Sequence, residues 1–164
     1  YTGEDGIEIM ANNSEADSLI SFLIEKGIKP CGLGSRDTLR LEASLPLYGF
    51  ELTEDITPVE ASLSWTITNE HDFLGSDRIK AQLQDGNHKI LKKFTIDSRK
   101  IARTETIGMS SDIKGVVTSG NFSPILNKSI GFILFENKPP QNLIEFDIRG
   151  NLIEGNIVNK RFLS

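Results

Sequence analysis

The sequence predicts an α+β protein in two parts, a helical first part and an all-β second part. Amphipathic helical spacing dominates the chain up to residue 86, whereas alternating apolar positions follow Asn87. The charge changes at the same place, because residues 1–86 carry 16 acidic and 6 basic side chains and residues 87–164 carry 7 acidic and 12 basic ones. We therefore expect a boundary between residues 84 and 90, with one unit on each side of it.

Start and stop signals predict three helices in the first part. The clearest begins with Ser14 ahead of acidic residues and ends at Gly27, and its apolar spacing predicts that it packs against another element. The other two are expected over residues 33–44 and 76–83. Two shorter patterns remain: Ile7-Glu8-Ile9 alternates like a strand, and Thr57-Pro58-Val59-Glu60 is typical of a helix start.

The second part is predicted to consist of strands without helices between them. Gly, Pro, Asn and Ser clusters separate the apolar runs, and Arg149-Gly150-Asn151 is a hairpin signal. This spacing is typical of a small antiparallel barrel or sandwich. The expected strands cover residues 89–97, 114–119, 129–135, 143–148 and 152–159.

Composition argues against several classes of function. Cys31 is the only cysteine and there are two histidines, so we expect no disulfide framework, no metal site and a reducing compartment. The acidic first part argues against nucleic-acid binding, and no apolar stretch is long enough for a membrane span. We interpret Cys31 as a buried structural thiol. We interpret the main cations of the second part as a solvated face: Lys92, Lys93, Arg99, Lys100 and Arg103.

Few residues point to chemistry by themselves. No phosphate-binding glycine loop or serine–histidine–aspartate set can be assembled. Arg36 and Arg40 lie four residues apart on a predicted helix, so an anion or carboxylate must offset their repulsion, and for Arg40 we expect a protein acid. Composition alone favours Glu8 as the solvent face of an edge strand over a ligand-binding role. Trp65 fits either the core, which we favour, or a stacking platform.

Five ordered motifs resemble the T-protein of the glycine cleavage system, the aminomethyltransferase family. They are Y-T-G-E-D-G-I-E-I at residues 1–9, G-L-G-S-R-D-T-L-R-L-E-A-S-L-P-L-Y-G at 32–49, D-I-T-P-V-E-A-S-L-S-W at 55–65, D-F-L-G at 72–75, and V-T-S-G-N-F-S-P at 117–124 with K-S-I at 128–130. The chain departs from the family pattern at Ser44 and Ser62, where the family usually has glycine or alanine. The abrupt start at Tyr1 is what we expect of the C-terminal portion of a family protein.

The resemblance implies a fold, a reaction and partners. Residues 1–86 would be the C-terminal part of an α/β folate-binding domain, and residues 87–164 a small antiparallel β-barrel domain. The family takes an aminomethyl group from the lipoylated H-protein, passes the one-carbon unit to tetrahydrofolate and releases ammonia. It works in the bacterial cytoplasm or in mitochondria, with neither nucleic acid nor a membrane as partner. The alternative is the related folate-binding module of a sarcosine or dimethylglycine dehydrogenase.

By motif match, the resemblance assigns folate contacts to four residues. Glu8 would accept the N–H donors of the pterin ring, and Arg36 would face its carbonyl side or the carboxylates of folate. Tyr48 and Trp65 would form walls of the folate pocket, whereas Arg40 would be structural. The resemblance assigns no catalytic residue to this portion, because an acidic residue near the reacting nitrogen lies upstream. We therefore expect the chain alone to be inactive.

Overall fold

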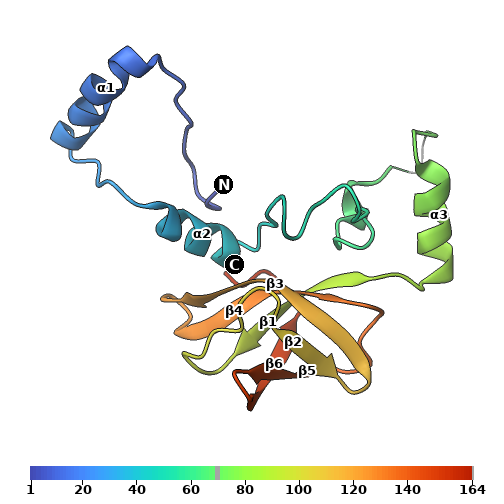
Figure 1. Ribbon diagram of the computed structural model, residues 1–164. Helices are drawn as coiled ribbons and strands as arrows, with labels where there is room; N and C mark the ends of the chain where they lie inside the picture. Colours follow the sequence, from blue (N-terminus) through green and yellow to red (C-terminus); the bar gives the residue numbers. More distant parts are fainter. Residues whose placement is uncertain (69–70, 164) are drawn as a thin grey trace.

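The computed structural model describes residues 1–68 and 71–163, and it combines helical segments with a closed β-barrel (Figure 1). The helices are α1 (Asn13–Glu25), α2 (Leu33–Glu42), the short 3₁₀ helix η1 (Ser64–Thr66) and α3 (Ser76–Asp85). The strands are β1 (Ile90–Ile96), β2 (Ile107–Ser110), β3 (Ile113–Ser123), β4 (Lys128–Phe135), β5 (Leu143–Ile148) and β6 (Asn151–Val158). The predicted α+β fold class is confirmed. Ser164, the end of the second predicted unit, lies outside the described residues.

The barrel has the strand order β1-β4-β3-β2-β5-β6, and every neighbouring pair is antiparallel. The pairing of β1 with β6, which sets Phe94 opposite Ile157, closes the sheet. The sequence alone left a barrel or a sandwich open, and this pairing decides for the barrel. Closure leaves no unpaired sheet edge, so every strand finds backbone partners on both sides.

Aromatic and β-branched side chains fill the barrel interior. Phe94, Phe135 and Phe146 are fully buried, and the ring centroids of Phe94 and Phe146 lie 4.6 Å apart. Tilted ring pairs at this distance add to the stability that burial of apolar area provides. The other buried members of this core are Ile96, Ala102, Val117, Ile133, Ile144 and Ile157.

Two glycines let neighbouring strands and rings approach closely. Gly120 on β3 stands opposite Gly131 on β4. A Cβ atom at Gly131 would collide with the Phe94 ring, and one at Gly120 would collide with the backbone of Ala102. Both positions therefore require glycine for packing, since the interior has no room for another carbon.

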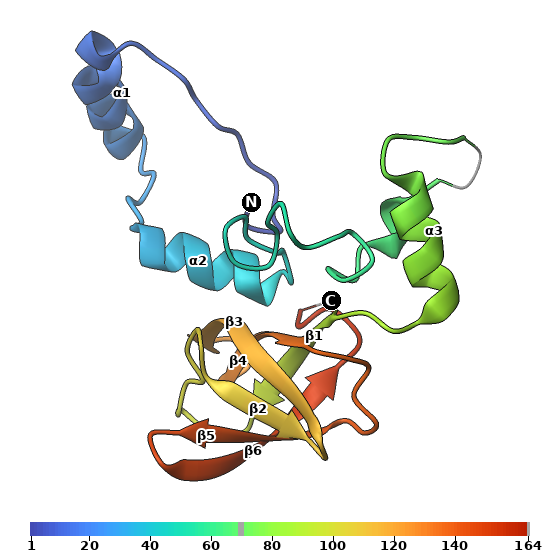
Figure 2. The same cartoon turned by 45° about the vertical axis from the view of Figure 1, so that its right-hand side comes forward.

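A second apolar cluster attaches α2 to the outside of the barrel. Leu41 of α2 is fully buried, and it packs with Leu91, Ile130, Phe132 and Phe162. Both ribbon views show α2 lying against the barrel, while α1 and α3 stand apart from it (Figures 1 and 2). The helical part is thus anchored to the barrel through α2.

The two ends of the chain both return to the segment that follows α2. The Tyr1 hydroxyl donates to the carbonyl of Pro46 at 2.6 Å. Near the other end, the backbone N–H of Phe162 donates to the Ser44 hydroxyl at 3.0 Å. Residues far apart in the sequence are therefore held together around one turn.

Two expectations for the start of the chain are wrong. Residues 7–9 form no strand, because no strand of the described residues lies beside them to pair with. Helix α1 forms, yet it has no buried residue and packs on no other element of residues 1–68 and 71–163, so Ile20, Phe22 and Ile24 remain about half exposed. Its capping and spacing signals are local, whereas packing needs a partner that the described residues lack.

Other expectations for single residues are also corrected. Cys31 is exposed rather than buried, and Trp65 is 81% exposed rather than part of the core. The segment that starts at Thr57 is a turn and not a helix, because Ser62 adopts a left-handed φ of 58° and ends it. Thr57 and Glu60 nevertheless cap each other's backbone N–H groups at 2.8 and 3.2 Å, as a helix start would.

One strand was not predicted, and one is longer than predicted. Strand β2, with the sequence Ile-Gly-Met-Ser, is too short to show alternation and depends on its neighbours β3 and β5. Strand β3 extends to Ser123 past a register shift between Val117 and Ser119. Among residues 1–68 and 71–163, no helix has both the length and the apolar character needed to cross a bilayer.

Candidate functional site

Helix α2 carries the two arginines that the sequence singled out, and the structure gives them different environments. Arg40 lies in the half of the helix that packs on the barrel and is 2% exposed, whereas the Arg36 side chain is 52% exposed. The guanidinium of Arg40 is therefore committed to the protein, and that of Arg36 faces solvent. The structural role expected for Arg40 and its pairing with a protein acid are confirmed.

Arg40 links three parts of the chain through its guanidinium. Its Nε donates to Asp37 Oδ1 at 2.8 Å, and its Nη1 donates to Glu51 Oε2 at 3.1 Å and to the carbonyl of Leu45 at 3.2 Å. Its Nη2 donates to the Ser119 hydroxyl of β3 at 2.9 Å. The Glu51 side chain is completely buried, so this pair depends on its close geometry to offset the loss of solvation.

Polar side chains on alternate positions of β3 continue this attachment. Besides Ser119, the amide of Asn121 donates to the Thr38 hydroxyl at 3.0 Å, and the Ser123 hydroxyl donates to Glu42. Alternate residues of a strand share one face, so this row of β3 points toward α2. These contacts with α2 give the polar residues of the V-T-S-G-N-F-S-P motif a structural role. These pairings were not predicted from the sequence, although polar residues at every second position of an apolar strand were a signal for them.

Glu8 and Arg36 meet at the free end of α2. Arg36 Nη2 lies 3.2 Å from Glu8 Oε1, although the residues are 28 positions apart. The Glu8 side chain is 83% exposed, and the Tyr1 ring lies beneath the guanidinium, with 5.6 Å from the Arg36 Cζ atom to the ring centroid. Burial raises the pKa of the Tyr1 hydroxyl, which keeps it a donor to Pro46. A carboxylate and a guanidinium therefore stand next to each other and open to a ligand.

The two rings proposed as pocket walls are both on the surface. Tyr48 is 70% exposed and Trp65 is 81% exposed. In the described part of the chain, neither has a hydrogen bond or ring contact with Glu8 or Arg36. Trp65 lines a cavity to which neither Glu8 nor Arg36 contributes. Of the four predicted site residues, Glu8 and Arg36 are thus in direct contact, whereas Tyr48 and Trp65 stay predictions as pocket walls.

The chemistry available at this pair is recognition by charge and hydrogen bonds. A carboxylate accepts two parallel N–H donors, and a guanidinium donates to carbonyl or carboxylate oxygens in a fixed planar geometry. Within residues 1–68 and 71–163, no group of three or more His, Cys, Asp and Glu side chains could hold a metal ion. The pair can bind and orient a ligand that offers a donor edge beside an acceptor.

Comparison with known proteins agrees with the motifs. The model of the GCVT N-terminal domain matches residues 1–71, and the model of the glycine cleavage T-protein C-terminal barrel domain matches residues 89–163. The two models describe successive parts of one kind of protein, and together they account for nearly the whole chain. The chain belongs to the glycine cleavage T-protein family. The predicted family resemblance is confirmed.

Relatives of known identity support the same assignment. The chain is 43% identical to an aminomethyltransferase of Thermosipho melanesiensis, over 99% of this chain and 46% of that protein. It is 41% identical to an aminomethyltransferase of Bacillus mycoides, over 99% of this chain and 47% of that protein. A crystal structure of glycine cleavage system aminomethyltransferase T from Bartonella henselae superimposes with a TM-score of 0.86 at 28% identity, over 99% of this chain and 48% of that one. The chain thus spans about half the length of these relatives.

Proposed function

We propose that this chain is the C-terminal portion of an aminomethyltransferase of glycine cleavage. In the proposed reaction, the aminomethyl carbon leaves the lipoyl sulfur of the H-protein and becomes the methylene bridge of 5,10-methylenetetrahydrofolate. The lipoyl arm is left as the dithiol, and the amino group departs as ammonia. No protein nucleophile is needed, so the task of the protein is to hold the folate and the lipoyl arm in place.

The observation that carries the proposal is the contact between Glu8 and Arg36. The two residues come from separate family motifs, and their side chains lie 3.2 Å apart with both groups open to solvent. We propose that the Glu8 carboxylate accepts the N3–H and 2-amino donors of the pterin ring, while Arg36 donates to the neighbouring carbonyl or to the folate carboxylates. Tyr48 and Trp65 stay predictions as pocket walls, since both rings are exposed and available.

The alternative is a folate-binding module of an amine dehydrogenase. The relatives favour the transferase, because the Thermosipho and Bacillus proteins are both aminomethyltransferases. The two functions differ in the donor of the carbon, which is the lipoyl arm in one case and a methylated amine in the other. A transfer assay therefore separates them.

The test joins the N-terminal half of the Thermosipho melanesiensis relative to Tyr1 of this chain. We expect the chimaera to form methylenetetrahydrofolate from aminomethyl-lipoyl H-protein, and this chain alone to form none because half of the positioning surface is missing. In the chimaera, Glu8→Gln should weaken tetrahydrofolate binding by about 1–3 kcal/mol, since the amide presents an N–H group to the pterin donors. Calorimetric titration with tetrahydrofolate measures this loss.

Glu25→Gln is the matched control. Glu25 is exposed at the end of α1, and its side chain has no hydrogen-bond or ion-pair partner among the described residues. The control should bind tetrahydrofolate as the parent does. Turnover by this chain alone would refute the expectation of inactivity. Equal affinity of the Glu8→Gln variant and the parent would remove Glu8 from the folate site.

A further inference from the structure

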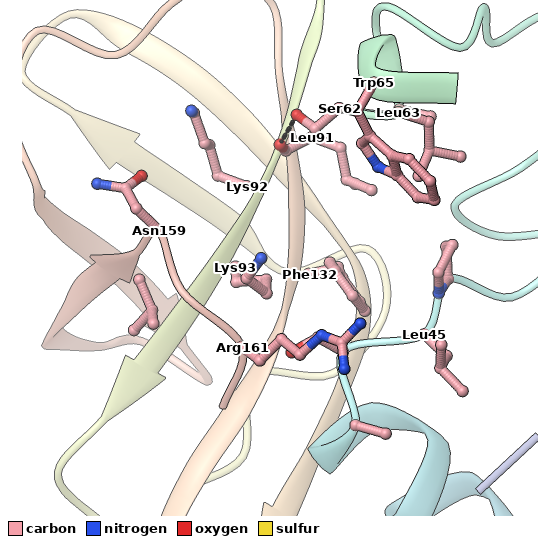
Figure 3. A pocket seen from close by; sticks show the side chains of 15 residues that line it. Leu45, Ser62, Leu63, Trp65, Leu91, Lys92, Lys93, Phe132, Asn159 and Arg161 are labelled. Atoms are coloured by element: carbon pink, nitrogen blue, oxygen red, sulfur yellow. Dashed lines mark hydrogen bonds between the residues drawn. The ribbon is translucent and has the colours of Figure 1, made fainter. Parts of the chain in front are cut away.

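A cavity of about 350 Å³ lies between the turn after α2, the turn before η1, and β1 (Figure 3). Its lining is positively charged: it includes Lys92, Lys93 and Arg161 and contains no acidic side chain. Two rings, the buried Phe132 and the exposed Trp65, form apolar walls. A cavity with cations on one side and flat apolar surface on the other has the chemistry of a site for an organic anion.

The positive charge in this cavity is not neutralised by the described part of the protein. Neither Lys93 nor Arg161 forms an ion pair or a side-chain hydrogen bond within residues 1–68 and 71–163. Burial lowers the pKa of Lys93, and the charges of Lys92 and Arg161 lower it further. The fold therefore holds the half-buried Lys93 near the exposed Arg161, which costs free energy that a bound anion would recover.

Strand geometry decides which cations face the cavity. Lys92 and Lys93 are successive residues of β1, so their side chains leave opposite faces of the strand. Figure 3 shows Lys93 and Arg161 on the side of Phe132, with Lys92 pointing away from them. Burial lowers the pKa of Lys92, and the nearby charge that lowers it further is that of Lys138. Lys93 and Arg161 are thus the two groups placed to bind an anion in the cavity.

Trp65 is held at the opposite wall by a fixed turn. The Ser62 hydroxyl donates to the carbonyl of Leu91 at 2.7 Å, which ties the turn before η1 to β1, and Figure 3 draws this bond as a dashed line. The indole is 81% exposed. An exposed aromatic face beside cations offers a surface on which a flat apolar group can stack.

We propose that this cavity binds a small aromatic carboxylate, with its carboxylate between Lys93 and Arg161 and its ring against Trp65. The inference goes beyond the proposed transferase function. Glu8 and Arg36, which carry the proposed function, do not line the cavity, and Trp65 is the residue that the two proposals share.

Trp65 is the only tryptophan of the chain, so its fluorescence reports on the cavity directly. The experiment titrates this chain with benzoate and follows the emission of Trp65. We expect a saturable change, and we expect Lys93→Gln and Arg161→Gln each to raise the dissociation constant by about fivefold or more, as loss of a charge-assisted hydrogen bond implies. Lys93→Arg, which keeps the charge, should restore binding to within about twofold.

Lys160→Gln is the matched control, because Lys160 is an exposed neighbour of Arg161 that does not line the cavity. It should bind benzoate like the parent. Benzamide has the same shape without the charge, and inorganic phosphate has charge without the ring, so both should bind much more weakly. The proposal is overturned if benzamide or phosphate binds as tightly as benzoate. It is equally overturned if benzoate causes no saturable change or if both glutamine variants retain the parent affinity.

Discussion

Ser44 and Ser62 stand at two backbone positions that strain ordinary residues. Their φ angles are 62° and 58°, in the left-handed region that glycine adopts without cost. Each serine hydroxyl makes a bond in return: Ser44 accepts from the N–H of Phe162, and Ser62 donates to the carbonyl of Leu91. These are the positions at which the chain departs from the family pattern of small residues. The hydroxyl bonds offset the backbone strain of serine at these two positions, so the departure from the family pattern needs no role in the chemistry of the site.

The balance at Ser62 between backbone strain and the bond to the carbonyl of Leu91 is testable by two substitutions. Ser62→Ala keeps the backbone strain and loses the bond to the carbonyl of Leu91, so it should lower the free energy of unfolding by about 1 kcal/mol. Ser62→Gly also loses that bond but relieves the strain, so it should stay within about 1 kcal/mol of the parent and be more stable than the alanine variant. Denaturant unfolding measures both. An alanine variant as stable as the glycine variant would contradict this account.

At the scale of elements, the attachment of α2 to the barrel depends on Arg40. Its guanidinium joins Asp37, Glu51 and the Ser119 hydroxyl, and both Arg40 and Glu51 are buried. Arg40→Met should lower the free energy of unfolding by about 3–5 kcal/mol, because it leaves the Glu51 carboxylate buried without its cation. Thermal and urea unfolding give the measurement.

A double variant separates the lost charge pair from lost packing. Adding Glu51→Gln to Arg40→Met removes the unpaired charge, so it should recover part of the stability that the single variant loses. If the double variant is less stable than Arg40→Met alone, the uncompensated Glu51 charge is not the cause. The helix would then depend on other contacts, such as the burial of Leu41.

Elements with local signals were predictable from sequence, and elements that depend on distant partners were not. The hairpin at Arg149-Gly150-Asn151 was predicted from its turn residues, and α3 was predicted over residues 76–83, two residues short of its end at Asp85. Strand β2 was missed and a strand at residues 7–9 was wrongly expected, because pairing with other strands decides both.

In the candidate site, too, local features were predictable from the sequence and distant partners were not. The i,i+4 spacing of Arg36 and Arg40 correctly indicated that carboxylates must offset their charges. Arg36 pairs with Glu8, and Arg40 pairs with both Asp37 and Glu51. Spacing could not identify Glu8 as the partner of Arg36 or Glu51 as the partner of Arg40. Turns of the chain outside α2 bring both glutamates to the helix. Glu8 was selected only through its family motif. The cationic cavity was not foreseen either, because β1, the segment after β6 and two turns form it together.

At the scale of the whole molecule, a well-packed barrel carries a sparsely packed helical part. Most of the exposed large hydrophobic side chains belong to the first part: Tyr1, Ile7, Ile9, Met10, Ile20, Phe22, Ile24, Ile28, Leu33, Tyr48, Phe50, Trp65, Phe73, Leu74 and Leu83. An apolar surface of this extent is typical of an interface. It agrees with the proposal that the chain is a portion of a longer transferase, the rest of which would cover much of this surface apart from the cavity at Trp65.

This contrast predicts an order of local stability along the chain. Amide hydrogen exchange should be slowest in β4, whose residues pair on both sides and include Ile133 and Phe135 of the barrel core. It should be near the rate of an unstructured peptide in α1, because 13 residues without a buried side chain make a marginal helix in water. Helix α2 is the internal control: it is shorter, at 10 residues, yet it is docked through Leu41 and Arg40, and it should be protected more than α1.

Equal protection of α1 and α2 would mean that length and capping outweigh docking. Protection of α1 as strong as that of β4 would mean that a partner, such as a second copy of the chain, covers its apolar face.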